Sequence, residues 1–385
     1  MNKLSRLLLA AALAGLAACA VPSNRFSSSL GSEAVSPEAL LESSPILAGA
    51  APPDVTRADI LAVTPEMQAF LDQYIEPGQY ETYRLKRLLY ALLGEGEFEL
   101  VYDDVTRTAP ETFRDRHGNC LSFTNLFVAM ARQAGLNAHY QEVDVPADWS
   151  LSGQSFLLMQ HVNVFLDLGH DQTRIVDFNI LDFNTTYERR VISDARARAH
   201  YYNNIGAEHM LGGESEAALA NFRASLRQDA GFAPAWINLG ILHRREGYPA
   251  WAERAYLQAL DVDAFNLVAM SNLASLYEEQ GLVERAAEYR DRVAAHRNRN
   301  PYYRFYLASE DFTNGDYGAA IGNLRYAIRK RDDEPRFYSL LSLSYLMQGD
   351  RQAARRWMEK AEEVAARTAD QQRYHHKLEW LMSQG

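Results

Sequence analysis

Two cysteines are all that this chain of 385 residues contains, at positions 19 and 120. This scarcity excludes a framework of several disulfides. It also argues against a structural zinc site, because one cysteine beside scattered histidines lacks the paired, closely spaced ligands that zinc requires. We therefore expect neither a metal nor another cofactor.

Positive charge and long apolar runs are scarce as well. The chain has 39 Lys and Arg against 50 Asp and Glu, whereas binding to nucleic acid needs a basic face that neutralises phosphates. No apolar run beyond the N-terminus reaches the roughly 18 to 20 residues that span a bilayer. Hydrophobic residues, in contrast, make up 47% of a length sufficient for two domains. We therefore exclude nucleic acid as a partner and expect globular domains.

The N-terminus has the pattern of an export signal. Lys3 and Arg6 precede an apolar run over residues 7–16, and Leu16-Ala17-Ala18-Cys19 follows. These last four residues resemble the bacterial lipobox, which implies a signal peptide over 1–18 and a lipidated Cys19. An ordinary signal peptide and an N-terminal transmembrane anchor are the alternatives. By analogy with such lipoproteins, a lipid anchor without Asp at position 20 implies the outer membrane, with the protein facing the periplasm.

The segment after the predicted signal peptide differs from the rest of the chain in composition. Residues 19–56 are rich in Ser, Ala and Pro with little periodicity, so we expect a flexible tether. Thr64-Pro65 then predicts the start of a helix that runs to Tyr74, and residues 80–93 predict a second helix.

The most informative stretch surrounds Cys120. Hydrophobic residues recur at three- and four-residue spacing from Phe123 to Ala131, after a break at Gly118-Asn119, which predicts a helix with Cys120 in its first turn. There the unpaired backbone N–H groups and the helix dipole favour a thiolate, the species that attacks a carbonyl carbon. We interpret Cys120 as a candidate nucleophile; the alternative is a core cysteine.

A nucleophilic thiolate needs a base, and the base needs a partner that orients it. Residues 161–167 alternate like a half-buried strand, and residues 173–178 predict the returning strand of a hairpin. If the hairpin is centred on Gly169, His161 and Asp177 face each other with Cβ atoms roughly 5 Å apart. A slip of one residue would place them on opposite faces. The rival bases are His117, His139 and His170.

A Gly-x-Cys that opens a helix, a strand that starts with His and a strand that ends in Asp resemble the transglutaminase-like core of papain-type cysteine enzymes. The resemblance covers residues 57–192 and implies an α+β papain-like domain. It implies Cys120 as nucleophile, His161 as general base and acid, and Asp177 as the residue that orients His161. Members with a tryptophan oxyanion donor carry it upstream of the cysteine, but no Trp precedes Trp149 here. The Cys120 backbone N–H and an unidentified upstream polar side chain would then bind the oxyanion.

From residue 199 the sequence repeats with a period of 34. Trp236-x-x-Leu239-Gly240, with Ala252 and Tyr256, resembles the tetratricopeptide pattern. Matching residues one period before and three periods after predict five helix pairs over residues 199–368. The predicted starts lie near 199, 233, 267, 301 and 335, and a capping helix is expected over 369–385. The resemblance implies an all-α solenoid, and the two patterns predict two independently folding domains.

By the same resemblance, the first helix of each pair lines a groove that binds a protein or peptide. The candidate partner-binding residues are Asn203, Ile237, Ser271, Phe305 and Ser339. The alternative is that some of these residues only pack inside the solenoid.

Together these features predict a membrane-anchored thiol amidase or peptidase of the cell envelope. Cys120 would form a thioester by acyl transfer from an amide, with water as the default acceptor and an amine as the alternative. The repeats would recruit a protein or peptide substrate, including one linked to peptidoglycan. The alternative function is a non-catalytic scaffold or assembly lipoprotein that uses both domains for protein–protein interaction.

Overall fold

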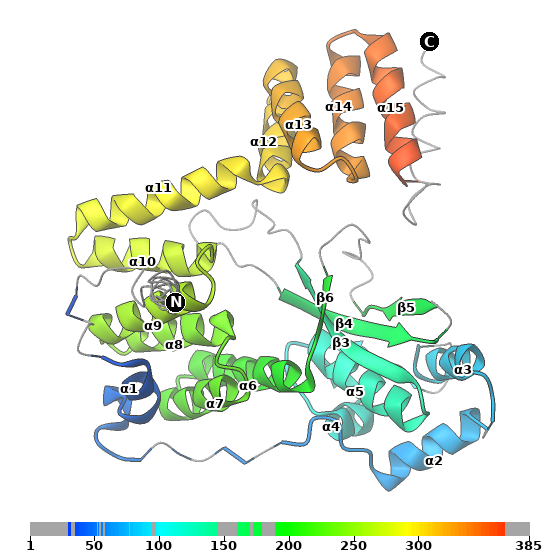
Figure 1. The fold of residues 1–385 in the computed structure, drawn as a ribbon, viewed down its shortest axis with the longest axis vertical. Coiled ribbons are helices and arrows are strands. Elements are labelled where there is room, and N and C mark those ends of the chain that lie inside the picture. Colours follow the sequence, from blue (N-terminus) through cyan, green and yellow to red (C-terminus); the bar gives the residue numbers. More distant parts are fainter. Residues whose placement is uncertain are drawn as a thin grey trace, which may run out of the picture.

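Figure 1 shows the computed structural model of the chain. The described residues are 30–31, 35–51, 53, 55–56, 58–76, 78–93, 98–144, 160–169, 172–178 and 189–365. The predicted signal peptide, Cys19, His170 and the predicted capping helix 369–385 lie outside them. Within the described part, no helix is both long enough and apolar enough to cross a membrane.

The first half of the chain is an α+β domain, as the sequence predicts. Its elements are α2 (Pro65–Tyr74), α3 (Glu81–Leu93), β1 (Val101–Tyr102), α4 (Ala109–Asp115), β2 (His117–Gly118), α5 (Cys120–Gln133), β3 (Asn137–Asp144), β4 (Gln160–Asp167), β5 (Thr173–Val176) and β6 (Arg189–Ile192). The helices predicted over 64–74 and 80–93 correspond to α2 and α3. Thr64 caps α2, because its side chain accepts a hydrogen bond from the Met67 N–H.

The main sheet of this domain is antiparallel, with strand order β5-β4-β3-β6. Helix α5 packs on β3 and β4, and α2, α3 and α4 pack around α5. The shared core contains the fully buried Phe127 of α5, Tyr140 of β3 and Val164 of β4. This packing buries α5 from Leu121 to Ala131 and leaves Cys120, its first residue, partly exposed.

The second half is an all-α solenoid. Its helices are α6 (Asp194–Leu211), α7 (Ser215–Gln228), α8 (Ala233–Arg245), α9 (Pro249–Val262), α10 (Leu267–Glu279), α11 (Val283–Arg299), α12 (Pro301–Thr313), α13 (Tyr317–Lys330), α14 (Pro335–Met347) and α15 (Arg351–Ala365). The first helices of pairs two to five begin at 233, 267, 301 and 335, as the 34-residue period predicts. The first pair begins earlier than 199, because Ser193 caps α6 and accepts a hydrogen bond from the Arg196 N–H.

Helix α6 belongs to both halves. Ala197, Tyr201 and Tyr202 lie in the core of the α+β domain, whereas Ala199 and Met210 lie in the core of the repeats. The two halves therefore share a helix that lies just after the predicted boundary at residues 192–199, and the independent folding of the two domains stays a prediction. The divided chain would expose one of the two apolar faces of α6.

A buried cluster of charged residues also holds α6 against the α+β domain. Glu142 of β3, only 3% exposed, accepts hydrogen bonds from His200 and Arg196 of α6 at 2.7 Å each and also pairs with Arg190 of β6. Burial raises the pKa of the Glu142 carboxyl, but the three partners outweigh burial and hold the pKa well below its usual range. Arg132 of α5 adds a bidentate pair with Asp194 at the start of α6.

The solenoid has more than one core. One hydrophobic cluster joins α6 to α11, and separate clusters join α12 to α15. The buried residues of α11 are Ala286, Tyr289 and Val293, and all three belong to the first cluster. In Figure 1, α11 runs from the block formed by α6–α10 towards α12.

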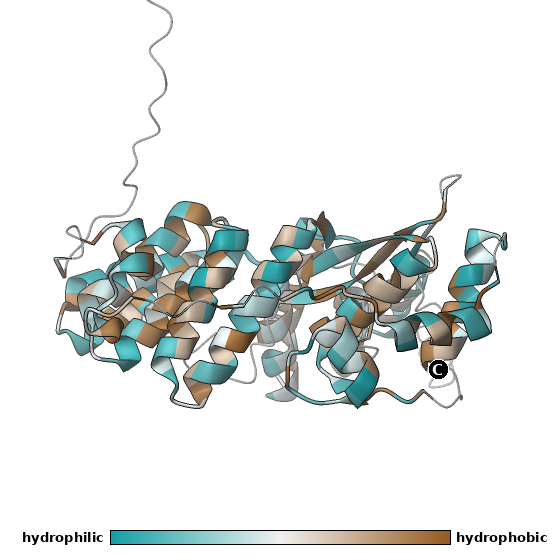
Figure 2. Ribbon diagram, turned by 90° about the horizontal axis from the view of Figure 1, so that it is seen from below, coloured by the Kyte–Doolittle hydropathy of each residue, from teal (hydrophilic) through white to brown (hydrophobic). Residues whose placement is uncertain are grey.

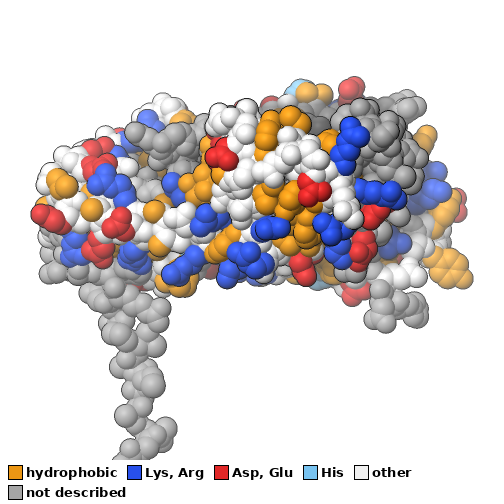
Figure 3. Space-filling model, turned by 90° about the horizontal axis from the view of Figure 1, so that it is seen from above, with side chains coloured by type: hydrophobic (Ala, Val, Ile, Leu, Met, Phe, Trp, Pro, Cys, Tyr) orange, Lys and Arg blue, Asp and Glu red, His pale blue; other side chains and the backbone are white. Residues whose placement is uncertain are grey.

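In Figure 2, hydrophilic residues predominate on the outward faces of the helices. Figure 3 shows one face on which acidic, basic and hydrophobic side chains are mixed.

Part of the expected tether is ordered. Residues 37–42 form α1 (Pro37–Glu42) and are followed by η2 (Pro45–Leu47), since Ser36 and Ser44 cap these helices and each is followed by proline. The expectation of a flexible tether over 19–56 is therefore wrong for this part. We call residues 35–47 the N-terminal arm.

The N-terminal arm packs on the second helices of the first two pairs. Its residues Val35, Leu40 and Leu47 are buried in the core of the repeats. Ser44 Oγ lies 3.0 Å from Nε2 of the buried His243, and the buried Arg223 donates to Glu42 at 2.7 Å. The apolar and polar groups together explain why a Ser- and Pro-rich segment is ordered here.

Candidate active site

Cys120 is the first residue of α5 and is partly exposed. The helix starts here because Asn119 is its N-cap, with an extended backbone (φ -87°, ψ -179°) and a side chain that accepts a hydrogen bond from the Ser122 N–H at 3.0 Å. A Cβ at Gly118 would lie 2.5 Å from Ser122 Cβ, so the approach to the helix requires glycine. The thiol therefore lies at the positive end of the helix dipole.

The hairpin that carries His161 and Asp177 differs from its predicted register. Val164 pairs with Val176, so the hairpin is centred on position 170, and the prediction of Gly169 as the centre is wrong. The cause is the turn, in which the Leu168 N–H bonds to the Gln172 carbonyl at 2.9 Å and thereby extends the pairing beyond the strands.

His161 and Asp177 nevertheless meet. They are diagonal neighbours on one face of the hairpin rather than direct opposites, a separation that side chains of this length can span. His161 Nε2 donates to Asp177 Oδ1 at 2.6 Å, and the two side chains are 10% and 7% exposed. The structure thus brings together the predicted base and the predicted orienting carboxylate.

The charge on His161 depends on both of its neighbours. Burial lowers the pKa of His161, but hydrogen bonds with Asp177 and Cys120 and the negative charge of both groups outweigh burial and raise it from 6.5 to about 9. Because Nε2 is bonded to Asp177, Nδ1 is the ring nitrogen left for the Cys120 thiol. The imidazole therefore lies between a thiol and a carboxylate, and it is protonated at neutral pH.

Asn163 completes this polar group, and the sequence prediction missed it. The side chain is fully buried, and its Nδ2 donates to Asp177 Oδ2 at 2.7 Å. Each oxygen of the Asp177 carboxylate therefore accepts one hydrogen bond, which fixes the orientation of the carboxylate. The strand alternation was the signal that could have found Asn163, because residues two apart in a strand share a face.

Tyr102 is the second residue that the sequence did not identify. Strand β1 runs parallel to β2, and Tyr102 pairs with Gly118, which leads into Cys120. Tyr102 is 60% exposed. Its partial burial raises the pKa of the phenol, and so does the negative charge of Cys120 and Asp104. The phenol therefore lies within electrostatic range of the thiol, on the exposed side of the site.

The two rival bases that the structure describes have other surroundings. The exposed His117 bonds through Nδ1 to the Asp115 carbonyl at 2.7 Å. The ring of His139 lies beside Phe165, at 6.5 Å between ring centres. Neither pairs with a carboxylate in the described residues. The part of the chain that the structure describes contains no group of three His, Cys, Asp or Glu side chains able to hold a metal ion.

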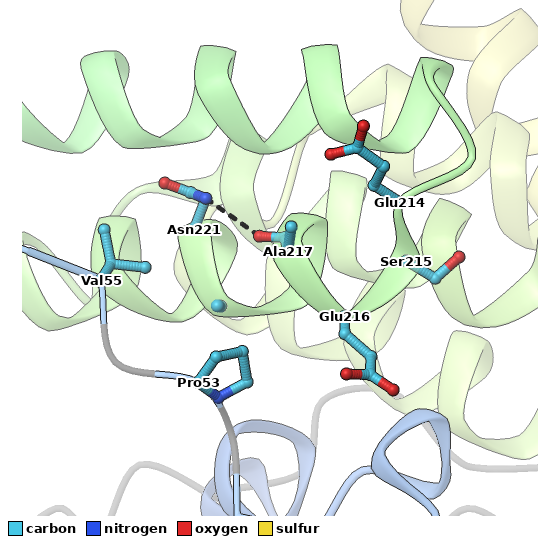
Figure 4. Close-up of a pocket in the computed structure, with 8 residues that line it drawn as sticks. Pro53, Val55, Glu214, Ser215, Glu216, Ala217 and Asn221 are labelled. Carbon is cyan, nitrogen blue, oxygen red and sulfur yellow. Dashed lines mark hydrogen bonds between the residues drawn. The ribbon is translucent and has the colours of Figure 1, made fainter.

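A cavity of about 640 Å³ lies beside the first helix pair (Figure 4). Pro53 and Val55 form one side of it, and Glu214, Ser215 and Glu216 lie on the α7 side. Its lining contains neither a thiol nor an imidazole. The cavity is therefore distinct from the site around Cys120.

The candidate partner-binding residues divide into two groups. Asn203, Ile237 and Ser339 are only 7%, 5% and 4% exposed, which favours the alternative that these residues pack inside the solenoid. Asn203 Oδ1 accepts a hydrogen bond from Asn238 Nδ2 of the second pair at 2.9 Å. Ser271 and Phe305 are partly exposed and remain candidates.

Comparisons with known structures give several matches of low score. The MamA protein is 20% identical, with a TM-score of 0.25 and coverage of 45% of this chain and 94% of that chain. YrrB, a TPR protein with an unusual peptide-binding site, is 18% identical, with a TM-score of 0.24 and coverage of 46% and 91%. PilF of Pseudomonas aeruginosa is 17% identical, with a TM-score of 0.26 and coverage of 49% and 94%. Scores this low say nothing further about the chain. No curated protein matches its sequence.

Two protein-family models match the sequence, one in each half of the chain. Residues 68–166 match the transglutaminase-like superfamily, a range that contains Cys120 and His161 and ends before Asp177. Residues 307–371 match the tetratricopeptide repeat. The chain thus joins a transglutaminase-like domain to tetratricopeptide repeats, in the order that its sequence predicts.

Proposed function

We propose that this protein is an exported thiol amidase or peptidase that transfers an acyl group from an amide to Cys120. The observation that supports this proposal most is the position of His161, bonded to Asp177 at 2.6 Å on one side and close enough to Cys120 on the other for the thiol to raise the His161 pKa. A nucleophile, a base within reach and a third group that orients the base are the parts of a cysteine hydrolase.

The first step is attack of the Cys120 thiolate on the amide carbon. The C–N bond of the resulting intermediate breaks as protonated His161 gives its proton to the leaving nitrogen, which yields a thioester and a free amine. In the second step neutral His161 removes a proton from water, the hydroxide attacks the thioester, and the thiolate leaves. His161 is then protonated again, which matches a pKa of about 9 in the resting site.

The oxyanion of each intermediate needs hydrogen-bond donors. We assign this role to the backbone N–H of Cys120, in the first turn of α5, and to the hydroxyl of Tyr102. The parallel pairing of Tyr102 with Gly118 places it beside the chain that enters this turn. Tyr102 would then supply the upstream polar side chain that replaces a tryptophan donor.

Location and recruitment complete the proposal. Lipidation of Cys19 would anchor the protein to the outer membrane with both domains in the periplasm. The presence of tetratricopeptide repeats supports a protein partner, and the proposed substrate is a protein or peptide, including one linked to peptidoglycan. Residues 30–31 lie beside α9, because the Leu30 N–H donates to Glu253 at 3.1 Å.

The proposal is tested with a simple acyl donor. A full-length chain with Cys19→Ser has Cys120 as its only thiol. Mixing it with p-nitrophenyl acetate should release a burst of one p-nitrophenolate per chain and leave an acetyl group on the Cys120 peptide, seen by mass spectrometry. The His161→Gln variant and the urea-unfolded chain control for ordinary thiol reactivity. Acetylation no faster than in these controls would favour the scaffold function instead.

A further inference from the structure

The first repeat reaches the segment that precedes Cys120. Glu208, near the end of α6, accepts a hydrogen bond through Oε1 from the backbone N–H of Thr106 at 2.9 Å. Thr106 is 4% exposed, so this N–H is removed from bulk water. A buried donor without an acceptor is costly, and the carboxylate of Glu208 supplies the acceptor.

Thr106 in turn holds the cap of the nucleophile helix. Its Oγ1 accepts a hydrogen bond from Asn119 Nδ2 at 2.8 Å. The Oδ1 of the same Asn119 side chain accepts the Ser122 N–H at 3.0 Å, which is the capping bond of α5. Asn119 is therefore fixed at both ends of its amide, and Cys120 is the next residue of the chain.

Two further contacts bind the same loop to α5. The Arg107 N–H donates to Ser122 Oγ at 2.8 Å, and Asn125 Nδ2 donates to the Arg107 carbonyl at 3.1 Å. These contacts tie residues 106–107 to α5 itself, whereas the bond from Glu208 comes from the solenoid. Because β3 and α5 also hold the start of α6 through Glu142 and Asp194, Glu208 extends from a helix that is itself fixed.

We infer that Glu208 is a positioning residue for the proposed nucleophile: through Thr106 and Asn119 it sets the first turn of α5 and the direction of the Cys120 side chain. This inference rests on the function proposed above. The first repeat is then part of the catalytic unit, in addition to any role in binding a partner. A misplacement of about 1 Å at a reacting group lowers rates by about a hundredfold.

The test compares four variants in the full-length Cys19→Ser chain. Glu208→Ala removes the acceptor of the Thr106 N–H, whereas Glu208→Gln keeps an amide oxygen of the same reach. Thr106→Val removes the Oγ1 that binds Asn119 and keeps the backbone N–H. Glu216→Ala, at an exposed carboxylate of α7, is the matched control. Each variant is measured for alkylation of Cys120 by iodoacetamide, for the acetylation burst and for its melting temperature.

We expect Glu208→Ala and Thr106→Val to slow alkylation and acetylation by about tenfold or more, with the double variant no slower than the slower single variant. Glu208→Gln should recover most of the wild-type rate, and Glu216→Ala should keep it. If Glu208→Ala lowers only the melting temperature, or if Glu208→Gln is as slow as Glu208→Ala, the positioning role is overturned. If Glu208→Ala does not fold, the comparison of Thr106→Val with Glu208→Gln decides in the same way.

Failure of the proposed function remains distinguishable. A wild-type chain that is never acetylated, but whose alkylation slows in Glu208→Ala, would reject the acyl-transfer proposal and keep the positioning role. A wild-type chain that is acetylated, with rates unchanged in both Glu208→Ala and Thr106→Val, would reject the positioning role alone.

Discussion

Asp177→Asn isolates the part of the site that controls His161. The Asp177 carboxylate accepts one hydrogen bond from His161 Nε2 at 2.6 Å and one from Asn163 Nδ2 at 2.7 Å. In the asparagine variant only one of the two positions is an acceptor. If the amide oxygen faces Asn163, the NH2 group faces His161. The NH2 group then donates a hydrogen bond, and Nε2 of His161 must accept it. The imidazole proton then lies on Nδ1, towards Cys120, in the tautomer that cannot take a proton from that side.

The expected loss of acetylation rate in Asp177→Asn follows from the charge of His161. The hydrogen bond to Asp177 is the strongest influence that raises the pKa of His161 to about 9, and burial works in the opposite direction. Without the carboxylate, the pKa of His161 should fall to its reference of about 6.5 or below. At pH 7.5 most of the imidazole would then be neutral, and the general acid would be lost. General acid–base catalysis contributes about 10²- to 10⁴-fold, which is the expected loss in acetylation rate.

Stability should change with pH for the same reason. The folded pKa of about 9 exceeds the unfolded reference of 6.5, so the stability that protonated His161 contributes is complete below about pH 6.5. It is lost as the pH rises through about 9, and its full size is about 3 kcal/mol. The wild-type chain should therefore melt at progressively lower temperature between pH 7 and pH 9.5, and Asp177→Asn should lack most of this slope.

The assay is a histidine titration by NMR on isotopically labelled protein, with the His161 signal assigned from the spectrum of His161→Gln. Acetylation rates and melting temperatures are measured over the same pH range. A His161 midpoint that is equal in the wild-type chain and in Asp177→Asn would refute the argument, because Asp177 would then have no part in holding the proton. Asn163→Ala is the control, since it leaves the carboxylate in place.

Three further predictions concern other parts of the molecule. Tyr102→Phe should slow the acetylation burst by about a hundredfold or more, the effect of one lost oxyanion donor, while alkylation of Cys120 is unchanged. Gly240→Ala should destabilise the repeats by about 1 to 3 kcal/mol in chemical denaturation, because the new Cβ would lie 2.5 Å from the Tyr256 ring, whereas Gly322→Ala, with open space around it, should not. Leu40→Asp should lower the melting temperature of the repeats, since Leu40 is fully buried in their core; an unchanged value would mean that the arm does not pack there.

The parts of the fold that the sequence predicted are those set by local spacing. The start of α5 follows from Gly118-Asn119 and from the hydrophobic period after Cys120, and both are read over a few residues. The repeat starts follow from a period of 34, because each helix pair packs on its neighbours in the same way. His161 and Asp177 meet although the hairpin centre is shifted, because long side chains on one face also reach diagonal partners.

The parts that the sequence did not predict depend on contacts between distant segments. The N-terminal arm has the composition of a linker, and its order comes from Leu40 in the repeat core and from Ser44 beside His243, which lies 199 residues away. The contact of Glu208 also joins distant segments, because nothing in the sequence around Glu208 indicates that its partner is Thr106. Composition and periodicity describe a segment and its immediate neighbours, so they carry no information about such pairs.

Helix α6 connects the first repeat to the candidate active site. Its faces lie in both cores and Glu208 touches the loop before Cys120, so motion of the first repeat would disturb the nucleophile. The clusters of α12–α15 are separate from the core that joins α6 to α11. A partner bound by the last two pairs, if the proposed recruitment is correct, would therefore contact no residue of the core at α6. The contacts that reach the loop before Cys120 therefore lie in the first repeat and not in the last two.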